Sequence, residues 1–167
     1  MNVALVVLVG MPGSGKSTVG RQLAKRLDAP FVDTDAFVES IHGRSPADLI
    51  RQIGEGPFRE LEVEALQTVL PGGAVIATGG GVVTTQPGRD LLSHERCVYL
   101  HATPDVLVTR VDGSDRPLLD GDPAGSLVRL LGVRDKWYRK VSEFELDASA
   151  PLDDLVDAIY ERVAGAP

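Results

Sequence analysis

Apolar residues recur along the chain in two patterns, as short continuous runs and as longer segments with helical spacing. The short runs predict strands at 4–10, 31–35, 74–78, 97–102 and 144–147. Spacings of three and four residues predict helices at 16–27, 46–53, 58–70, 104–111, 127–140 and 152–163. Because strands and helices alternate, the pattern predicts an α/β fold whose parallel sheet has about five strands.

Local residues support several of these boundaries. Ser45 and Thr103 each precede a proline that begins a predicted helix, so we expect their hydroxyls to cap these helices. The run 4–10 is apolar on both faces, as a central strand covered by helices on each side requires. The polar stretch 112–126 holds three glycines, two prolines and four aspartates, which predicts a long loop that acts as a lid.

Composition narrows the class of protein. A chain of 167 residues, 43% of them hydrophobic, is long enough for a single domain with its own core. The 17 Lys and Arg against 24 Asp and Glu give a net charge of −7, which argues against a nucleic-acid partner. The lone cysteine, Cys97, excludes an intramolecular disulfide and favours a reducing, cytoplasmic location. No apolar run approaches the ~20 residues of a membrane helix, so we expect no membrane partner. We also expect the protein to be a monomer.

A phosphate-binding motif follows the first predicted strand. The stretch 10–17, GMPGSGKS, fits G-x-x-x-x-G-K-[ST] and precedes a predicted helix. Its backbone N–H groups and the helix N-terminus suit phosphate oxygens, Lys16 suits the β and γ phosphates, and Ser17 suits Mg²⁺. The predicted ATP-binding residues here are Gly13, Ser14, Gly15, Lys16, Ser17 and Thr18. The alternative is a glycine-rich turn with an incidental lysine.

The motif alone leaves GTPases, ATPases, nucleic-acid motors and small-molecule kinases open. The only asparagine is Asn2, so the N-K-x-D motif that reads guanine is absent. A motor would carry a longer chain and a larger basic surface. The residues that bind the phosphate acceptor must therefore decide the class.

Two aspartates lie where the molecule that accepts the phosphate is expected to bind. Asp33 and Asp35 end the predicted strand 31–35, and residues two apart on an extended segment point the same way. They would face the crevice beyond the carboxyl ends of the strands, next to the phosphate loop. One could order a Mg²⁺ shell and the other accept a proton from an attacking hydroxyl. Either could instead cap the following helix.

Two further segments have residues suited to binding a small carboxylic acid. Arg59 falls in the first turn of the predicted helix 58–70, where its charge opposes the helix dipole, and Glu62 lies on the same face. Binding a carboxylate through the guanidinium fork would explain the position of Arg59, and a surface ion pair is the alternative. The glycines at 79–81 follow a predicted strand and allow a ligand to approach the backbone, unless they form a flexible loop.

Taken in order, these segments resemble the shikimate kinases over nearly the whole chain. The resemblance rests on GMPGSGKST at 10–18, DTD at 33–35, GRSPADLI at 43–50, GEGPFRELE at 54–62, GGG at 79–81 and RPLL at 116–119. It implies a P-loop NTPase fold like that of nucleoside monophosphate kinases, with a substrate-binding helical region at 34–62 and a lid at 112–126. The implied reaction transfers the ATP γ-phosphoryl to the 3-hydroxyl of shikimate, in aromatic amino-acid biosynthesis.

The resemblance also implies roles for individual residues. Asp35 would hold the reacting hydroxyl, while Arg59 and Arg134 would bind the carboxylate and Glu62 would orient these arginines. Backbone at Gly80 and Gly81 would meet the ring hydroxyls. Asp33 would assist the Mg²⁺ held by Ser17, and Arg116 would close over the phosphates. The catalytic set implied is Lys16, Asp35 and Arg116.

The chain departs from the family pattern at two places. The usual R-x-P-L-Y reads RDKWY at 134–138, and Arg139 nearby competes with Arg134 for the same role. The stretch 147–151 has no arginine beside the adenine, which leaves backbone and Arg110 as ATP contacts, although Arg110 fits a solvated helix position equally well. The alternative functions are a kinase of another small metabolite, such as gluconate or a nucleoside monophosphate, and a non-catalytic nucleotide-binding module.

Overall fold

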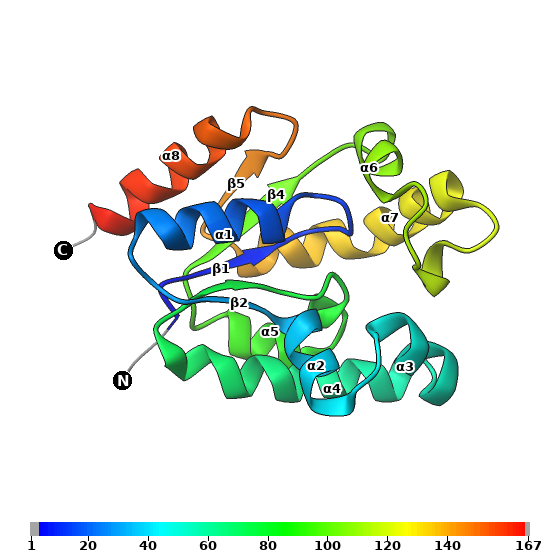
Figure 1. Cartoon of the computed structure of the whole chain (residues 1–167). Coiled ribbons are helices and arrows are strands. Elements are labelled where there is room, and N and C mark those ends of the chain that lie inside the picture. The colour runs from blue at the N-terminus through cyan, green and yellow to red at the C-terminus, as the bar shows by residue number, and fades with distance from the viewer. Residues whose placement is uncertain (1–3, 166–167) are drawn as a thin grey trace.

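The computed structural model describes residues 4–165, which form a parallel sheet between two layers of helices (Figure 1). The five strands are β1 (Val6–Val9), β2 (Phe31–Asp33), β3 (Val75–Ala77), β4 (Cys97–His101) and β5 (Phe144–Asp147). Their order in the sheet is β2-β3-β1-β4-β5, and every neighbouring pair is parallel. The predicted α/β class and the five predicted strands are confirmed.

Helices cover both faces of this sheet and extend beyond its carboxyl edge (Figure 1). On one face lie α1 (Lys16–Arg26) and α8 (Leu152–Ala164), and on the other lie α4 (Glu55–Val69), α5 (Gln86–Leu92) and α7 (Pro123–Val141). Near the carboxyl ends of the strands lie α2 (Thr34–His42), α3 (Pro46–Ile53) and α6 (Pro104–Val111). Three 3-10 turns, η1 (Leu70–Gly72), η2 (Val82–Thr84) and η3 (Pro117–Leu119), complete the described elements.

Burial follows the position of each strand in the sheet. All four residues of the central β1 have no exposed surface, as expected for an apolar strand covered on both faces. At the edge, β5 alternates between half-buried and exposed residues. The core thus places the carboxyl ends of β1, β2 and β3 side by side, where the phosphate loop and the two acceptor segments begin.

A second hydrophobic cluster joins the helices that follow β2. Val38 of α2, Leu49 of α3, and Phe58 and Ala65 of α4 pack together apart from the main core. This small core gives α4 a fixed position at the edge of the sheet. It thereby sets the position of Arg59, the residue after Phe58.

The boundaries near these helices correct parts of the sequence prediction. Because α4 begins at Glu55, directly after Gly54 ends α3, Arg59 lies in the second turn, and the helix-dipole argument for its position is wrong. Because β2 ends at Asp33, Asp33 and Asp35 do not share an extended segment. The helix α5 was not predicted, and α2 was expected only as the helix that an aspartate cap would begin. The helix α7 already begins at Pro123.

The two predicted helix caps have different outcomes. Ser45 accepts a hydrogen bond from the Asp48 backbone N–H at 3.1 Å, which confirms its cap on α3. Thr103 precedes α6 but its side chain makes no capping hydrogen bond. Within residues 4–165, none of the helices combines the length and apolar character needed to cross a bilayer.

Candidate active site

The loop between β1 and α1 curls around the ammonium group of Lys16. Gly13 and Gly15 have φ values of 83° and 89°, a left-handed conformation that glycine adopts at little cost. A Cβ on Gly13 would also lie 2.8 Å from a methyl group of Val111. Lys16 Nζ donates hydrogen bonds to the carbonyls of Gly10 and Met11, each at 2.9 Å. The loop therefore has the tight, glycine-dependent backbone that a phosphate cradle needs.

Lys16 is itself buried in this loop. Burial lowers the pKa of Lys16 to about 8, although the charge of Asp35 opposes the shift. Around neutral pH the side chain is still charged. Among residues 4–165, its hydrogen-bond partners are two backbone carbonyls and one hydroxyl of the same loop. An anionic phosphate would be a stronger partner for this ammonium than backbone carbonyls are.

Ser17 and Asp33 bring two oxygen atoms together beside the loop. The Ser17 hydroxyl donates to Oδ2 of Asp33, and Oδ1 of Asp33 accepts from the backbone N–H groups of Asp35 and Ala36 at 3.0 and 3.2 Å. Asp33 thus caps α2 with one oxygen, as the capping alternative expected, while the other faces Ser17. A hydroxyl and a carboxylate are hard oxygen donors of the kind that Mg²⁺ accepts alongside phosphates and water.

Asp35 stands in the first turn of α2 and does not cap it. Burial, with a smaller effect from the charge of Asp33, raises the pKa of Asp35 above its ordinary value. A carboxylate with a raised pKa is a better proton acceptor than an ordinary surface aspartate. The two aspartates therefore have different surroundings, because Asp33 caps α2 and contacts Ser17 whereas Asp35 is half-buried without a capping contact.

Two cavities meet at Asp35. The phosphate cavity is lined by residues that include Gly13, Gly15, Lys16, Ser17, Thr18 and Asp33. The acceptor cavity is lined by residues that include Phe58, Arg59, Glu62, Gly81 and Arg134. Pro12, Asp35, Gly80 and Arg116 line both. A carboxylate and a guanidinium thus mark the passage through which a group could move from one cavity to the other.

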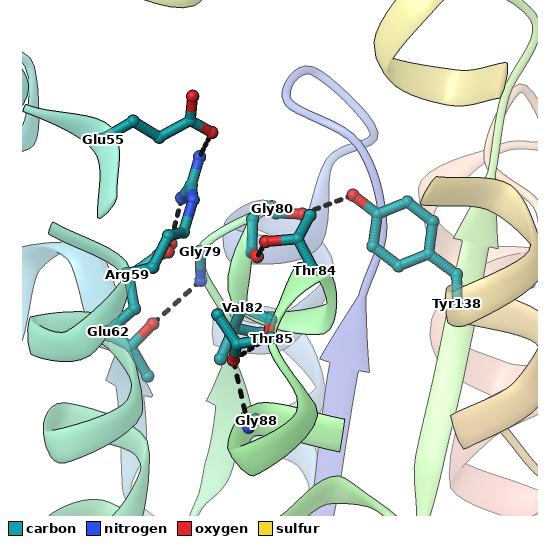
Figure 2. A network of polar contacts seen from close by, with 12 residues as sticks. Glu55, Arg59, Glu62, Gly79, Gly80, Val82, Thr84, Thr85, Gly88 and Tyr138 are labelled. Atoms are coloured by element: carbon teal, nitrogen blue, oxygen red, sulfur yellow. Dashed lines mark hydrogen bonds and ion pairs between the residues drawn. The ribbon is translucent and has the colours of Figure 1, made fainter. Parts of the chain in front are cut away.

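Two buried charged residues, Arg59 and Glu62, line the acceptor cavity, and Figure 2 shows them with Glu55. Arg59 donates from Nη1 to Oε2 of Glu62, and from Nη2 to Oε1 of Glu55 at 3.0 Å. Arg59 is 7% exposed and Glu62 is 2% exposed. Burial raises the pKa of Glu62 to about 7, although Arg59 opposes the rise. Among residues 4–165, Nε of Arg59 is buried and without a hydrogen-bond partner, so one donor of this guanidinium is unpaired.

The structure distinguishes Arg134 from Arg139, the two candidates for the second arginine that would bind the substrate carboxylate. Arg134 of α7 is 2% exposed and lines the acceptor cavity. Arg139 is exposed and binds Asp135 and Glu145 outside this cavity. The acceptor cavity therefore holds the guanidinium groups of Arg59, Arg116 and Arg134.

The glycine loop 79–81 packs against these charged groups. A Cβ on Gly81 would overlap the guanidinium of Arg59, and one on Gly79 would overlap the carboxylate of Glu62. The Gly79 backbone N–H donates to Oγ1 of Thr34 at 2.9 Å. Because these glycines have no side chains, the ion pair of Arg59 and Glu62 can pack directly against their backbone. This packing favours the interpretation that the glycines allow close approach to the backbone over that of a flexible loop.

A third cavity continues the phosphate cavity toward the loop after β5. Gly13, Gly15 and Thr18 line both, and Ser14, Arg110 and Ala148 are also among the lining residues of the third. Arg110 donates to the carbonyls of Ala148 at 2.8 Å and Gly13 at 3.3 Å. Arg110 therefore links the β5–α8 loop to the phosphate loop. The alternative, in which its side chain lies in solvent, does not account for these two contacts.

Arg116 reaches the cavities from the segment between α6 and α7. Its Nε donates to Oγ of Ser114 at 3.1 Å, and the neighbouring Asp115 accepts from Nη1 of Arg51 in α3 at 3.0 Å. This segment thus spans the acceptor cavity and is anchored to the helical region on its far side.

Sequence reasoning missed three residues that touch this site. Glu55 stands four residues before Arg59, a spacing that allows an ion pair on a helix. Thr34 lies between the two aspartates, and Tyr138 lies one turn after Arg134 on α7. Helical spacing could have suggested Glu55 and Tyr138, whereas no local signal points to the contact between Thr34 and Gly79.

A parallel sheet of this order, a glycine-rich phosphate loop and an adjoining acceptor cavity define a P-loop kinase that phosphorylates a small molecule. Comparison with known proteins places it more narrowly. The sequence model of the family described as shikimate kinase matches residues 12–164, and the chain belongs to the shikimate kinase family. The chain is thus an ATP-dependent phosphotransferase of the type that acts on an alcohol group.

Individual relatives agree with this assignment. A shikimate kinase of Symbiobacterium thermophilum is 41% identical over 165 residues, covering 95% of each chain. A solved shikimate kinase of Acinetobacter baumannii in complex with shikimate is 33% identical with a TM-score of 0.91, covering 96% of this chain and 92% of that one. A deoxyadenosine kinase of M. mycoides is 13% identical with a TM-score of 0.63, covering 96% of this chain and 100% of that one, which shows a fold shared with nucleoside kinases.

Proposed function

We propose that the chain transfers the γ-phosphoryl group of ATP to the 3-hydroxyl of shikimate, giving shikimate 3-phosphate and ADP. The observation that carries this proposal is the junction of the phosphate and acceptor cavities at Asp35 and Arg116. A donor bound in one cavity and an acceptor bound in the other would bring the reacting atoms together there, which supplies most of the catalysis in phosphoryl transfer.

Asp35 is the group that we assign to the attacking hydroxyl. The hydroxyl oxygen forms a bond to the γ phosphorus while the bond from this phosphorus to the β–γ bridging oxygen breaks, and its electron pair leaves with ADP. The hydroxyl proton passes to Asp35, whose burial raises its pKa and makes it a better acceptor for this proton.

The arginines of the acceptor cavity account for an acidic substrate. Arg59 and Arg134 are both largely buried and line the cavity, so a substrate carboxylate there would meet two guanidinium groups. Backbone at Gly80 and Gly81 lines the same cavity and is open to the substrate. Glu62 holds Arg59 in place through a buried ion pair.

The phosphate cavity is the donor half of the site, because it would hold ATP, and its cations would neutralise the charge of the phosphates. Lys16 would exchange its backbone partners for phosphate oxygens, and Arg116, which lines both cavities, would meet the transferring group. Ser17 and Asp33 would hold Mg²⁺ at the phosphates, and the ion would supply further charge neutralisation there. The backbone of Gly13, Ser14, Gly15 and Thr18 would bind phosphates, and Arg110 would lie beside the nucleoside.

The proposed arrangement of the site also bears on the domain organisation, the oligomeric state and the location of the protein. One chain holds both halves of the site, which supports a single domain acting as a monomer. Residues 34–62 would form its substrate-binding region and 112–126 its lid, although the last part of this stretch is the first turn of α7. The buried lone thiol of Cys97 is compatible with a cytosolic location.

A parallel assay of acceptors tests the proposal. The full chain with ATP and Mg²⁺ should release ADP rapidly with shikimate, and only at background level with gluconate or nucleoside monophosphates. A larger rate with one of the other acceptors would identify a different small-molecule kinase. ATP binding without acceptor-dependent ADP release would indicate a nucleotide-binding module instead.

A further inference from the structure

The glycine loop of the acceptor cavity is held by hydroxyl groups from three elements. Thr34 of α2 accepts from the Gly79 N–H at 2.9 Å, and Thr84 of η2 donates to the Gly81 carbonyl at 2.6 Å. Between them, the hydroxyl of Tyr138 in α7 donates to the Gly80 carbonyl at 2.5 Å (Figure 2). Only the contact from Tyr138 comes from the helix that also carries Arg134.

Tyr138 is built into the junction between the two halves of the site. Its side chain is fully buried, and its hydroxyl oxygen lies 3.8 Å from the sulfur of Met11 in the phosphate loop. Burial raises the pKa of Tyr138 to about 12, although the nearby guanidinium of Arg134 opposes the rise. The hydroxyl is therefore protonated around neutral pH and can donate to Gly80.

The contact with Gly80 fixes the direction of the next amide. In a trans peptide the carbonyl of one residue and the N–H of the next point in opposite directions, and the described backbone has no cis peptide. Tyr138 and Arg59 lie on opposite sides of the loop in Figure 2. Holding the Gly80 carbonyl toward Tyr138 therefore turns the Gly81 N–H toward the side of Arg59.

The Gly81 N–H is available to a ligand on that side. Gly81 lines the acceptor cavity, and no acceptor for its N–H occurs among residues 4–165. A peptide between two glycines is also easier to reorient than most, because both residues have wide conformational freedom. Without the hydroxyl of Tyr138, the peptide would be free to turn the Gly80 carbonyl into the cavity.

We propose that Tyr138 is a positioning residue that keeps the peptide between Gly80 and Gly81 oriented with its N–H toward the acceptor, so that the cavity receives a hydrogen-bond donor rather than a carbonyl. This inference rests on the proposed function. A donor at this place attracts the oxygen-rich substrate, whereas a carbonyl would repel its carboxylate.

A pair of tyrosine variants tests the inference. Tyr138→Phe removes the hydroxyl and keeps the ring, and Tyr99→Phe is the matched control. Tyr99 is also fully buried and stacks on Tyr138 with ring centroids 5.0 Å apart, but its hydroxyl donates to Asp135 at 2.9 Å, away from the glycine loop. Both variants lose one buried hydroxyl, and only one of them loses the contact with Gly80.

The expected result is a selective loss of acceptor affinity. For Tyr138→Phe, the KM for shikimate should rise about tenfold, which corresponds to about 1.4 kcal/mol, with the KM for ATP within about twofold of the wild type. Tyr99→Phe should leave both values within about twofold. Equal shikimate KM values in the two variants would overturn the inference, as would a parallel rise in the KM for ATP in Tyr138→Phe.

A measurement on the wild-type chain keeps the test independent of the folding of either variant. The ¹H–¹⁵N resonance of Gly81 should shift strongly when shikimate is added, and an unshifted resonance with bound shikimate would refute the inference. If the wild-type chain neither binds shikimate nor releases ADP with it, the proposed function fails instead.

Discussion

The phosphate loop is one continuous stretch, 10–18, whereas the acceptor cavity collects its charged groups from α2, α4, α7 and the segment before η3. The loop is defined by backbone conformation around Gly13 and Gly15. The cavity is defined by side chains, above all the ion pairs that Arg59 makes with Glu55 and Glu62. One half is therefore local and the other is assembled by tertiary contacts.

This difference affects how each half responds to change. A backbone cradle binds any phosphate chain of suitable length, because N–H groups and a helix N-terminus recognise charge rather than identity. A cavity of buried side-chain charges recognises one arrangement of acid and hydroxyl groups, because each unpaired charge is costly there. Selectivity for the acceptor thus depends on contacts that single substitutions can remove.

The largest expected effect separates catalysis from nucleotide binding. In Asp35→Asn, kcat should fall about 10²- to 10⁴-fold, because the amide cannot accept the hydroxyl proton. ATP affinity should change only a few-fold, since the backbone of the phosphate loop is untouched. Steady-state kinetics and calorimetric ATP titration measure the two quantities. Turnover close to that of the wild type would remove Asp35 from the mechanism.

The next effect concerns the acceptor alone. In Arg59→Ala, the KM for shikimate should rise about 100-fold because a charge-assisted contact is lost, with little change for ATP. Arg139→Ala is the matched control, since Arg139 also makes two ion pairs but lies outside the cavity. A main effect on ATP affinity in Arg59→Ala would contradict its assignment to the acceptor.

Stability gives a second readout for the same substitution. Arg59→Ala leaves the 2% exposed Glu62 without its cation, so the melting temperature should also fall. Adding Glu62→Gln should restore much of the stability without restoring the KM for shikimate. Recovery of both by the second substitution would mean that Arg59 acts only as a partner for Glu62.

A smaller effect, dependent on pH, belongs to the donor half. Lys16 has its pKa lowered to about 8, so the free protein loses this charge as the pH rises through that value. ATP phosphates favour the charged form, and ATP binding above pH 8 must then take up a proton. ATP affinity should be about tenfold weaker at pH 9 than at pH 7. Calorimetry in buffers of different ionisation enthalpy measures both the affinity and the proton uptake, and a flat profile would exclude this role for Lys16.

The same contrast explains what the sequence could predict. The phosphate loop, the five strands and the helix α3 (Pro46–Ile53) follow from local patterns, and the structure has each of them, although β2 ends two residues before the predicted end at 35. Residues 54–58 were harder, because Gly54 ends one helix and begins the next without a connecting loop. The first turn of α4, and with it the position of Arg59, was therefore misjudged.

Contacts within the acceptor half could not be predicted from local patterns. The hydrogen bond from Ser17 to Asp33, which distinguishes the surroundings of the two aspartates, joins residues 16 positions apart. The contact of Tyr138 with Gly80 joins residues 58 positions apart. The family resemblance supplied Arg134 and Arg116, and the packing of α7 then places Arg134 in the wall of the cavity and Arg139 outside it.

The smallest expected effect tests whether Glu55 competes with the substrate carboxylate for Arg59 in the acceptor half of the site. Glu55 binds Nη2 of Arg59 from a half-exposed position, so its carboxylate occupies a donor that a substrate carboxylate would use. Glu55→Gln should lower the KM for shikimate about two- to threefold, because the pair is weak and screened, and the gain should shrink at high salt. Glu64→Gln, on an exposed position of the same helix, should have no effect. A rise in the KM for Glu55→Gln would show instead that Glu55 orients Arg59 for the substrate, and the acceptor cavity would then depend on both of its carboxylates rather than on Glu62 alone.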